Sequence, residues 1–231
     1  MKRLILSTLT AAILGVSAAA SADNLSIGFA DPLSSLDPQL NNHAGDRSVA
    51  LHFWDLLIEN KWNKLQPGLA VSWKPLDSTT WEFKLREGVK WQDGTPFTAD
   101  DLIYSYTRAR AVPGSVATYA GYLRTIDTMT AKDPLTLIVK TKAPNPDLPL
   151  NLASVHVVSK HVGEKSTTED YNSGKAMVGT GPYKFVSYTP GDRVLMERND
   201  GYWGEKATWD KVNYRYINNA CLLYTSDAAD E

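Results

Sequence analysis

The chain has 231 residues, of which 43% are hydrophobic and 22% charged, a composition typical of a folded globular protein rather than a disordered segment or a membrane bundle. Its formal net charge is −2, and loss of the two basic residues at the amino terminus would bring it to about −4. With this balance and no cluster of lysine and arginine, the protein is not expected to bind nucleic acid, because phosphates require a concentrated positive surface.

The amino terminus has the pattern of an exported protein. Two basic residues precede an apolar run over residues 4–16, and small residues follow up to Ala22. The run is shorter than the ~20 residues that a membrane-spanning helix needs, so it predicts a signal peptide over residues 1–22, cleaved after Ala22. Cys221 is the only cysteine, so neither a lipid anchor at the cleavage site nor an internal disulfide is expected.

The first strand predicted for the mature chain ends in a polar loop. Residues 25–29 are apolar, and turn-forming residues follow over 31–38. Ligand sites in α/β folds gather beyond the carboxyl ends of strands. Asp31, Leu33 and Ser34 are therefore candidate ligand-binding residues, and an ordinary strand exit is the alternative interpretation of the same residues.

Apolar residues at helical spacing come next and predict a core helix with Asp46 as its N-cap. His52 on this helix has no second histidine or cysteine at ligand spacing, so no metal site is expected there. Much later in the chain, the polar stretch from Gly163 to Lys175 predicts a crossover or an exposed linker.

Residues 81–106 combine strand, turn and helix signals in one run. Apolar and charged residues alternate from Trp81 to Arg86, which predicts a half-buried strand with a charged face. After a turn, Thr98 is expected to cap a helix, with Asp101 three residues on completing a capping box. Further strands are predicted at 135–139, 183–188, 193–198 and 211–217, and the second and third of these form a hairpin.

The loop Gly179-Thr180-Gly181-Pro182 stands immediately before the predicted strand that begins at Tyr183. Two glycines allow the backbone to approach a neighbouring group closely, and Thr180 presents a hydroxyl. The loop fits neither a Walker motif nor a Rossmann fingerprint, since a strand follows it. Gly179, Thr180, Gly181 and Tyr183 are candidate ligand-binding residues.

Four stretches in order resemble the family 5 extracellular solute-binding proteins, the peptide- and nickel-binding components of ABC importers. The longest is WEFKLREGVKWQDGTPFTADDLIYSY at 81–106. The others are LDPQ at 36–39, PGLAVSW at 67–73, and VGTGPYKF with ERNDGYWG at 178–185 and 197–204. The resemblance covers about residues 24 to 218.

The resemblance implies a truncated α/β fold of the periplasmic-binding-protein type II. The expected parts are a discontinuous first lobe over residues 23–46 and 172–219, an inserted smaller α+β domain over 47–171, and a second lobe that is missing. Residues 220–231 break the resemblance and are expected to be a non-native tail. A chain without its opposing lobe is expected to bind ligand weakly and to have low solubility.

The resemblance also implies the function. Such a protein is periplasmic, monomeric at full length, binds a di- or oligopeptide and delivers it to the membrane permease of an ABC transporter. Glutathione, opines, sugars and nickel chelates are other ligands that the resemblance allows. Tyr119 is expected to lie near the peptide backbone, and a surface tyrosine that closes a loop is the alternative for this residue.

Two other classes of function stay open. A secreted hydrolase of the glycosidase type would use paired carboxylates such as Asp100 and Asp101, but adjacent helical residues point about 100 degrees apart and Asp101 suits the capping box. A non-catalytic interaction module of the cell envelope would share the same core signals. No catalytic residue, cofactor or metal ligand is expected.

Overall fold

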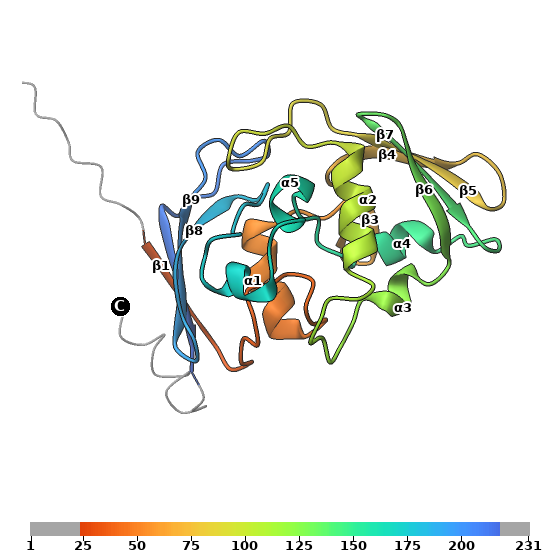
Figure 1. Ribbon diagram of the computed structural model, residues 1–231. Helices are drawn as coiled ribbons and strands as arrows, with labels where there is room; N and C mark the ends of the chain where they lie inside the picture. Colours follow the sequence, from red (N-terminus) through yellow and green to blue (C-terminus); the bar gives the residue numbers. More distant parts are fainter. Residues whose placement is uncertain (1–23, 218–231) are drawn as a thin grey trace, which may run out of the picture.

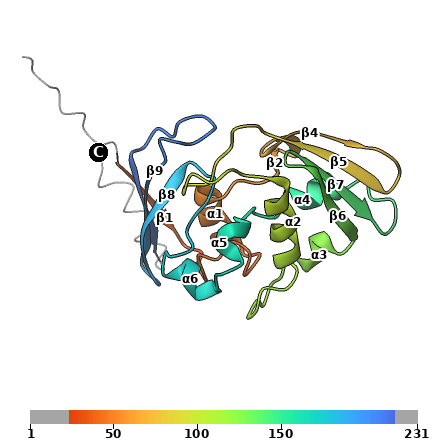
Figure 2. The same cartoon turned by 45° about the horizontal axis from the view of Figure 1, so that its top comes forward.

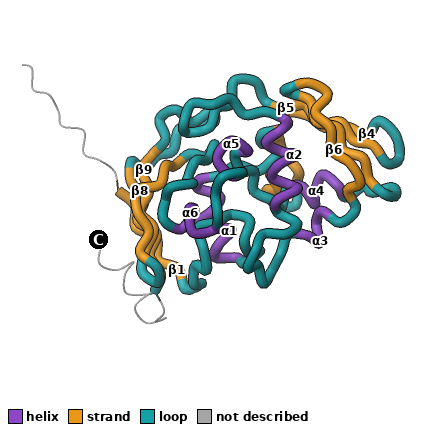
Figure 3. Tube along the Cα trace, viewed as in Figure 1, coloured by secondary structure: helices purple, strands orange, loops and turns teal. Residues whose placement is uncertain are grey.

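The computed structural model describes residues 24–217 (Figure 1). Two four-stranded sheets lie on opposite sides of the molecule, and the helices lie between them, as Figure 3 also shows. The predicted signal peptide over 1–22 and the predicted tail over 220–231 lie outside the described residues.

The first sheet joins the two ends of the described chain. Its strand order is β1-β10-β9-β8, with β1 parallel to β10 and the other pairs antiparallel. In the register of the parallel pair, Phe29 lies opposite Tyr216, so the carboxyl ends of both strands meet at one edge. The bounds are β1 (Asn24–Phe29), β8 (Tyr183–Thr189), β9 (Arg193–Arg198) and β10 (Lys211–Tyr216).

The second sheet is antiparallel and has the order β4-β5-β7-β6, and a separate hairpin precedes it. One of its two inner strands contains the alternating run after Thr80, as predicted, and on the charged face of that strand Glu82 is not exposed to solvent. This side chain is largely buried and lies 3.6 Å and 3.7 Å from the amines of Lys74 and Lys132. The bounds are β2 (Ile58–Lys61), β3 (Lys64–Pro67), β4 (Ala70–Pro75), β5 (Thr80–Leu85), β6 (Ile126–Asp133) and β7 (Thr136–Thr141).

The helix α2 (Ala99–Arg108) begins as its sequence predicts and packs on β6 and β7. Thr98 and Asp101 form the predicted capping box, in which the Thr98 N–H donates to Asp101 Oδ2 at 2.9 Å. The helix α1 (Ala44–Phe53) differs from its prediction, because its N-cap is His43. Asp46 lies inside the first turn, where its carboxylate accepts hydrogen bonds from a distant loop instead.

The remaining helices are short. The polar stretch predicted as a linker contains a helix with its own capping box between Thr167 and Asp170, and its Tyr171 is buried. The exposed linker, one of the two alternatives predicted here, is wrong, because Tyr171 is buried and both Thr168 and Asn172 hydrogen-bond to residues 35–37. The crossover stays a prediction. The bounds are α3 (Ala120–Leu123), α4 (Leu148–Leu152), α5 (Lys160–Gly163) and α6 (Thr168–Asn172), seen together in Figure 2.

One hydrophobic core connects the two sheets. Buried side chains run from Val212 in the first sheet through Phe53 and Trp54 to Phe83 in the second. Both predicted domain boundaries fall inside helices, at the first turn of α1 and at the last residue of α6. The division into a discontinuous lobe and an inserted domain stays a prediction.

Candidate ligand-binding site

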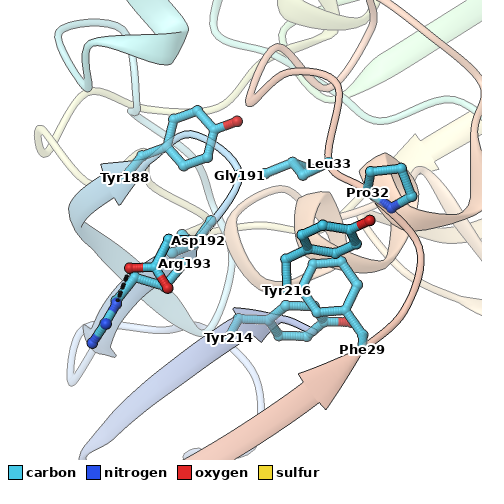
Figure 4. Close-up of a pocket in the computed structure, with 10 residues that line it drawn as sticks. Phe29, Pro32, Leu33, Tyr188, Gly191, Asp192, Arg193, Tyr214 and Tyr216 are labelled. Atoms are coloured by element: carbon cyan, nitrogen blue, oxygen red, sulfur yellow. Dashed lines mark hydrogen bonds and ion pairs between the residues drawn. The ribbon is translucent and has the colours of Figure 1, made fainter. Parts of the chain in front are cut away.

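Aromatic side chains gather where β1 and β10 end (Figure 4). The rings of Phe29 and Tyr214 have centroids 4.3 Å apart, and those of Phe29 and Tyr216 6.2 Å apart. The Ile217 N–H donates to the Phe29 carbonyl at 2.9 Å, so the chain after β10 is held beside the loop after β1. The edge where two parallel strands end is the usual position for ligands in sheets of this kind.

The pocket at this edge is shallow. Its volume is about 30 Å³, far below the roughly 300–1,000 Å³ of pockets that enclose small ligands. It is therefore too small to enclose a ligand by itself. Its lining residues are Phe29, Pro32, Leu33, Tyr188, Gly191, Asp192, Arg193, Val194, Tyr214 and Tyr216 (Figure 4).

The loop after β1 is fixed to the first turn of α1. The Ser34 N–H donates to Asp46 Oδ1 at 2.7 Å, and the Ser34 hydroxyl donates to Asp46 Oδ2. The Asn41 amide donates to the Ser34 hydroxyl at 3.1 Å. A carboxylate in a first helical turn also interacts favourably with the helix dipole. These contacts hold Leu33 against the aromatic rings, because Ser34 is its immediate neighbour.

Of the predicted residues Asp31, Leu33 and Ser34, Leu33 lines the aromatic edge, and the other two flank it in sequence without lining it. Asp31 is exposed, and its backbone carbonyl packs close to Gly45, where an added Cβ would lie 3.2 Å from that oxygen. Tyr188 and Tyr216 belong to the same wall, and sequence reasoning missed both. The alternation of Tyr214 and Tyr216 along the last strand, which places them on one face, was the available signal.

The loop from Gly179 to Pro182 approaches a helix end. The Gly181 N–H donates to the Phe53 carbonyl at 2.9 Å, and a Cβ added at Gly179 would lie 1.8 Å from the same oxygen. Thr180 is buried, and its hydroxyl accepts from the Asp55 N–H at 3.4 Å. The group that the two glycines allow the backbone to approach is thus the carboxyl end of α1.

The remaining two candidates are buried. Tyr183 is 6% exposed and its hydroxyl donates to the Trp209 carbonyl at 3.2 Å. Tyr119 has no exposed surface, its hydroxyl donates to the Asn41 carbonyl at 3.4 Å, and burial raises its pKa. The structure does not bring these residues to the aromatic edge, and their contact with a ligand stays a prediction.

Of the two carboxylates considered for a hydrolase, Asp101 is held by hydrogen bonds within the fold, whereas Asp100 is exposed. Asp101 Oδ1 accepts from the Lys160 N–H at 2.8 Å, and Oδ2 accepts from the Thr98 N–H and from Trp91 Nε1 at 3.3 Å. Burial raises the pKa of Asp101, and these hydrogen bonds partly offset that rise because they stabilise the ionised carboxylate. Within residues 24–217, no group of His, Cys, Asp and Glu side chains is arranged to hold a metal ion. None of the helices in this range is long and apolar enough to cross a membrane.

The arrangement of sheets and helices is that of the type II periplasmic binding proteins. The structure of OppA from Burkholderia pseudomallei superposes with a TM-score of 0.79 and 26% identity, covering 90% of this chain and 45% of that one. DppA from Helicobacter pylori, solved with the peptide STSA, gives 0.76 and 25% identity, covering 89% of this chain and 45% of that one.

The family follows from the sequence match. The profile of the bacterial extracellular solute-binding proteins, family 5, matches residues 64–223, and the chain belongs to this family. The periplasmic oligopeptide-binding protein OppA of Salmonella typhimurium is 28% identical over 253 residues, which cover 94% of this chain and 46% of that protein. The murein peptide-binding protein MppA of Escherichia coli is 27% identical, covering 81% and 38%. The chain thus spans less than half the length of these relatives.

Proposed function

We propose that this chain supplies one wall of the peptide-binding site of a periplasmic solute-binding protein that serves an ABC importer. The observation that carries the proposal is the shallow aromatic edge formed where β1 and β10 end. Tyr188, Tyr216 and Leu33 offer apolar surface there. Family membership and the similarity to oligopeptide-binding relatives support the ligand class.

The physical logic is that of a clamp. A shallow wall excludes water from a peptide only when a second surface closes over it. Two-lobed binding proteins bring such a surface into place by hinge closure around the ligand. Asp46 holds the loop of this wall through Ser34, and the hydrophobic core packs behind its strands. The protein then passes the ligand to a membrane permease, and an export signal at residues 1–22 would place it in the periplasm.

A peptide titration tests this function. We expect trialanine to bind the purified chain weakly, with a dissociation constant of about 1 mM or above, because the pocket at the aromatic edge encloses little of a ligand. Calorimetry should show no comparable binding of glucose, and replacement of Tyr216 by alanine should abolish the peptide signal. Equal affinity of the Y216A variant, or hydrolysis of the peptide, would overturn the proposal.

A further inference from the structure

The tip of the β2–β3 hairpin presents a tryptophan to solvent. Lys61 and Lys64 pair across the end of the hairpin, so Trp62 and Asn63 form a two-residue turn. Trp62 is 95% exposed. All seven tryptophans lie in the described residues, and the next most exposed, Trp209, is 38% exposed. An indole ring that stays in water forgoes the apolar burial that stabilises a fold, so Trp62 adds little to this one.

The backbone at this tip also disfavours tryptophan. The φ angles of Trp62 and Asn63 are 55° and 59°, and within residues 24–217 no other residue except glycine has a positive φ. Positive φ at both central residues is the pattern of the type I′ turn, in which asparagine, aspartate and glycine are preferred because other side chains crowd the backbone. The turn therefore forms despite Trp62 rather than because of it. Unfavourable backbone positions of this kind are concentrated at functional sites.

The surroundings of Trp62 suit a lipid surface better than a protein interface. The other residues of the exposed run 60–64 are all polar, and two of them are lysines. The amine of Lys61 lies 2.5 Å from the carboxylate of Glu59, whereas within residues 24–217 the amine of Lys64 has no carboxylate within 4.0 Å. A tryptophan that anchors a protein interface is surrounded by contacts that exclude water, and lysine is depleted there. Indole rings concentrate at the headgroups of a bilayer, where amines also meet anionic lipids.

We propose that the tip of the β2–β3 hairpin docks on the surface of an anionic phospholipid bilayer. The ring of Trp62 enters the headgroup region, and the amine of Lys64 lies beside the lipid phosphates. The contact is weak and reversible, because it consists of one inserted ring and one unpaired amine. The hairpin contributes no residue to the aromatic edge, so this proposal and the peptide site stand or fail separately.

Vesicles that contain equal amounts of phosphatidylglycerol and phosphatidylcholine test the docking. Bromine atoms on the acyl chains of the phosphatidylcholine quench only indole rings in contact with them, so brominated vesicles should quench the tryptophan emission of the unmodified chain and leave that of the W62N variant unchanged. In vesicle sedimentation, W62N should bind at least about tenfold more weakly, because the buried ring is lost. The K64Q variant should bind about fivefold more weakly to these vesicles and no differently to vesicles of phosphatidylcholine alone.

Two controls separate docking from a structural role. Asparagine accommodates a positive φ, so the thermal midpoint of W62N should equal or exceed that of the unmodified chain. Val116 is 82% exposed in another loop, and V116N should bind vesicles as the unmodified chain does. Residues 1–22 are the same in every variant and cannot cause a difference between them. The proposal fails if W62N binds as V116N does, if W62N has the lower thermal midpoint, or if bromine leaves the emission of the unmodified chain unchanged, as a tip that docks on a protein would.

Discussion

Arg108 and Asp37 form a two-pronged ion pair that ties the end of α2 to the LDPQ loop. Arg108 Nη1 donates to Asp37 Oδ1 at 2.9 Å, and Nη2 donates to Oδ2 at 2.6 Å. Asp37 is fully buried, and the Thr168 hydroxyl of α6 donates to the same carboxylate at 2.8 Å. The Asp37 carboxylate therefore holds together three segments that lie far apart in the sequence: its own loop, the end of α2 and the start of α6.

Removal of one partner of this ion pair should destabilise the fold strongly. The R108Q variant leaves the buried Asp37 carboxylate without its cation, and we expect a loss of about 3–5 kcal/mol in the free energy of unfolding. Urea denaturation measures it. The exposed pair of Lys160 and Glu164, 3.9 Å apart, is the matched control, and E164Q should change stability by less than about 1 kcal/mol. Similar losses in both variants would contradict the role given to Asp37.

The close approach of the Gly179 loop to α1 predicts a steric effect. In the G179A variant the new Cβ would meet the Phe53 carbonyl oxygen, so the loop must move and its hydrogen bond to α1 must lengthen. We expect a loss of more than about 2 kcal/mol. Thermal unfolding monitors it.

The control for this variant is Gly121, which lies in α3 with no atom within 4 Å of a Cβ built on it. The G121A variant should leave stability unchanged or raise it slightly, because alanine favours helix. A G179A protein as stable as G121A would show that the loop does not depend on contact with the helix end.

His156 should make stability dependent on pH. Burial lowers its pKa to about 4, the hydrogen bond of its Nδ1 with the Trp54 carbonyl opposes this, and the charge of Arg47 adds to the lowering. The unfolded chain therefore binds the proton more tightly than the folded one. The stabilisation is complete above a pH of about 6.5 and is lost as pH falls toward about 4, by about 3 kcal/mol.

Urea midpoints between pH 7 and pH 4 check this dependence, with the H156Q variant as the comparison. H156Q should flatten the slope even if it lowers stability overall. Burial raises the pKa of Asp55, so the stabilisation from its protonated form is lost as pH rises. This change is opposite in sign to that of His156 over part of this range. A slope that is equally steep in H156Q would assign the pH dependence to other groups.

The hydrogen bonds from the loop after β1 to Asp46 predict a local effect on amide hydrogen exchange. Replacement of Asp46 by alanine removes both acceptors that hold Ser34, so amide hydrogen exchange should accelerate in residues 31–35. The exchange of β5, in the other sheet, should not change. Uniform acceleration throughout the protein would indicate a global loss of stability instead.

Several elements were predictable because local rules determine them. The capping box at Thr98 and Asp101 and the hairpin of β8 and β9 depend on residues close in sequence, and the structure confirms them. Asp46 was assigned as a helix cap by the same rules and the assignment was wrong, because its partner Ser34 is twelve residues away. Local patterns do not specify which distant group a buried carboxylate meets.

The candidate site was less predictable for the same reason. The loop after β1 could be proposed from the strand end alone, whereas the aromatic wall required the parallel pairing of the first and last strands, which brings Phe29 beside Tyr214 and Tyr216. The glycines at 179 and 181 correctly indicated a close backbone approach, but composition does not reveal that the approached group is a helix end.

Photocrosslinking tests the central claim most directly. A tripeptide that carries benzoylphenylalanine in its middle position is irradiated with the chain, and the modified residues are mapped by mass spectrometry. We predict crosslinks in residues 29–34 and 214–217, with loss of both when excess trialanine is present. Crosslinks confined to residues 47–61, or spread without competition by trialanine, would contradict the assignment of the peptide site to the aromatic edge.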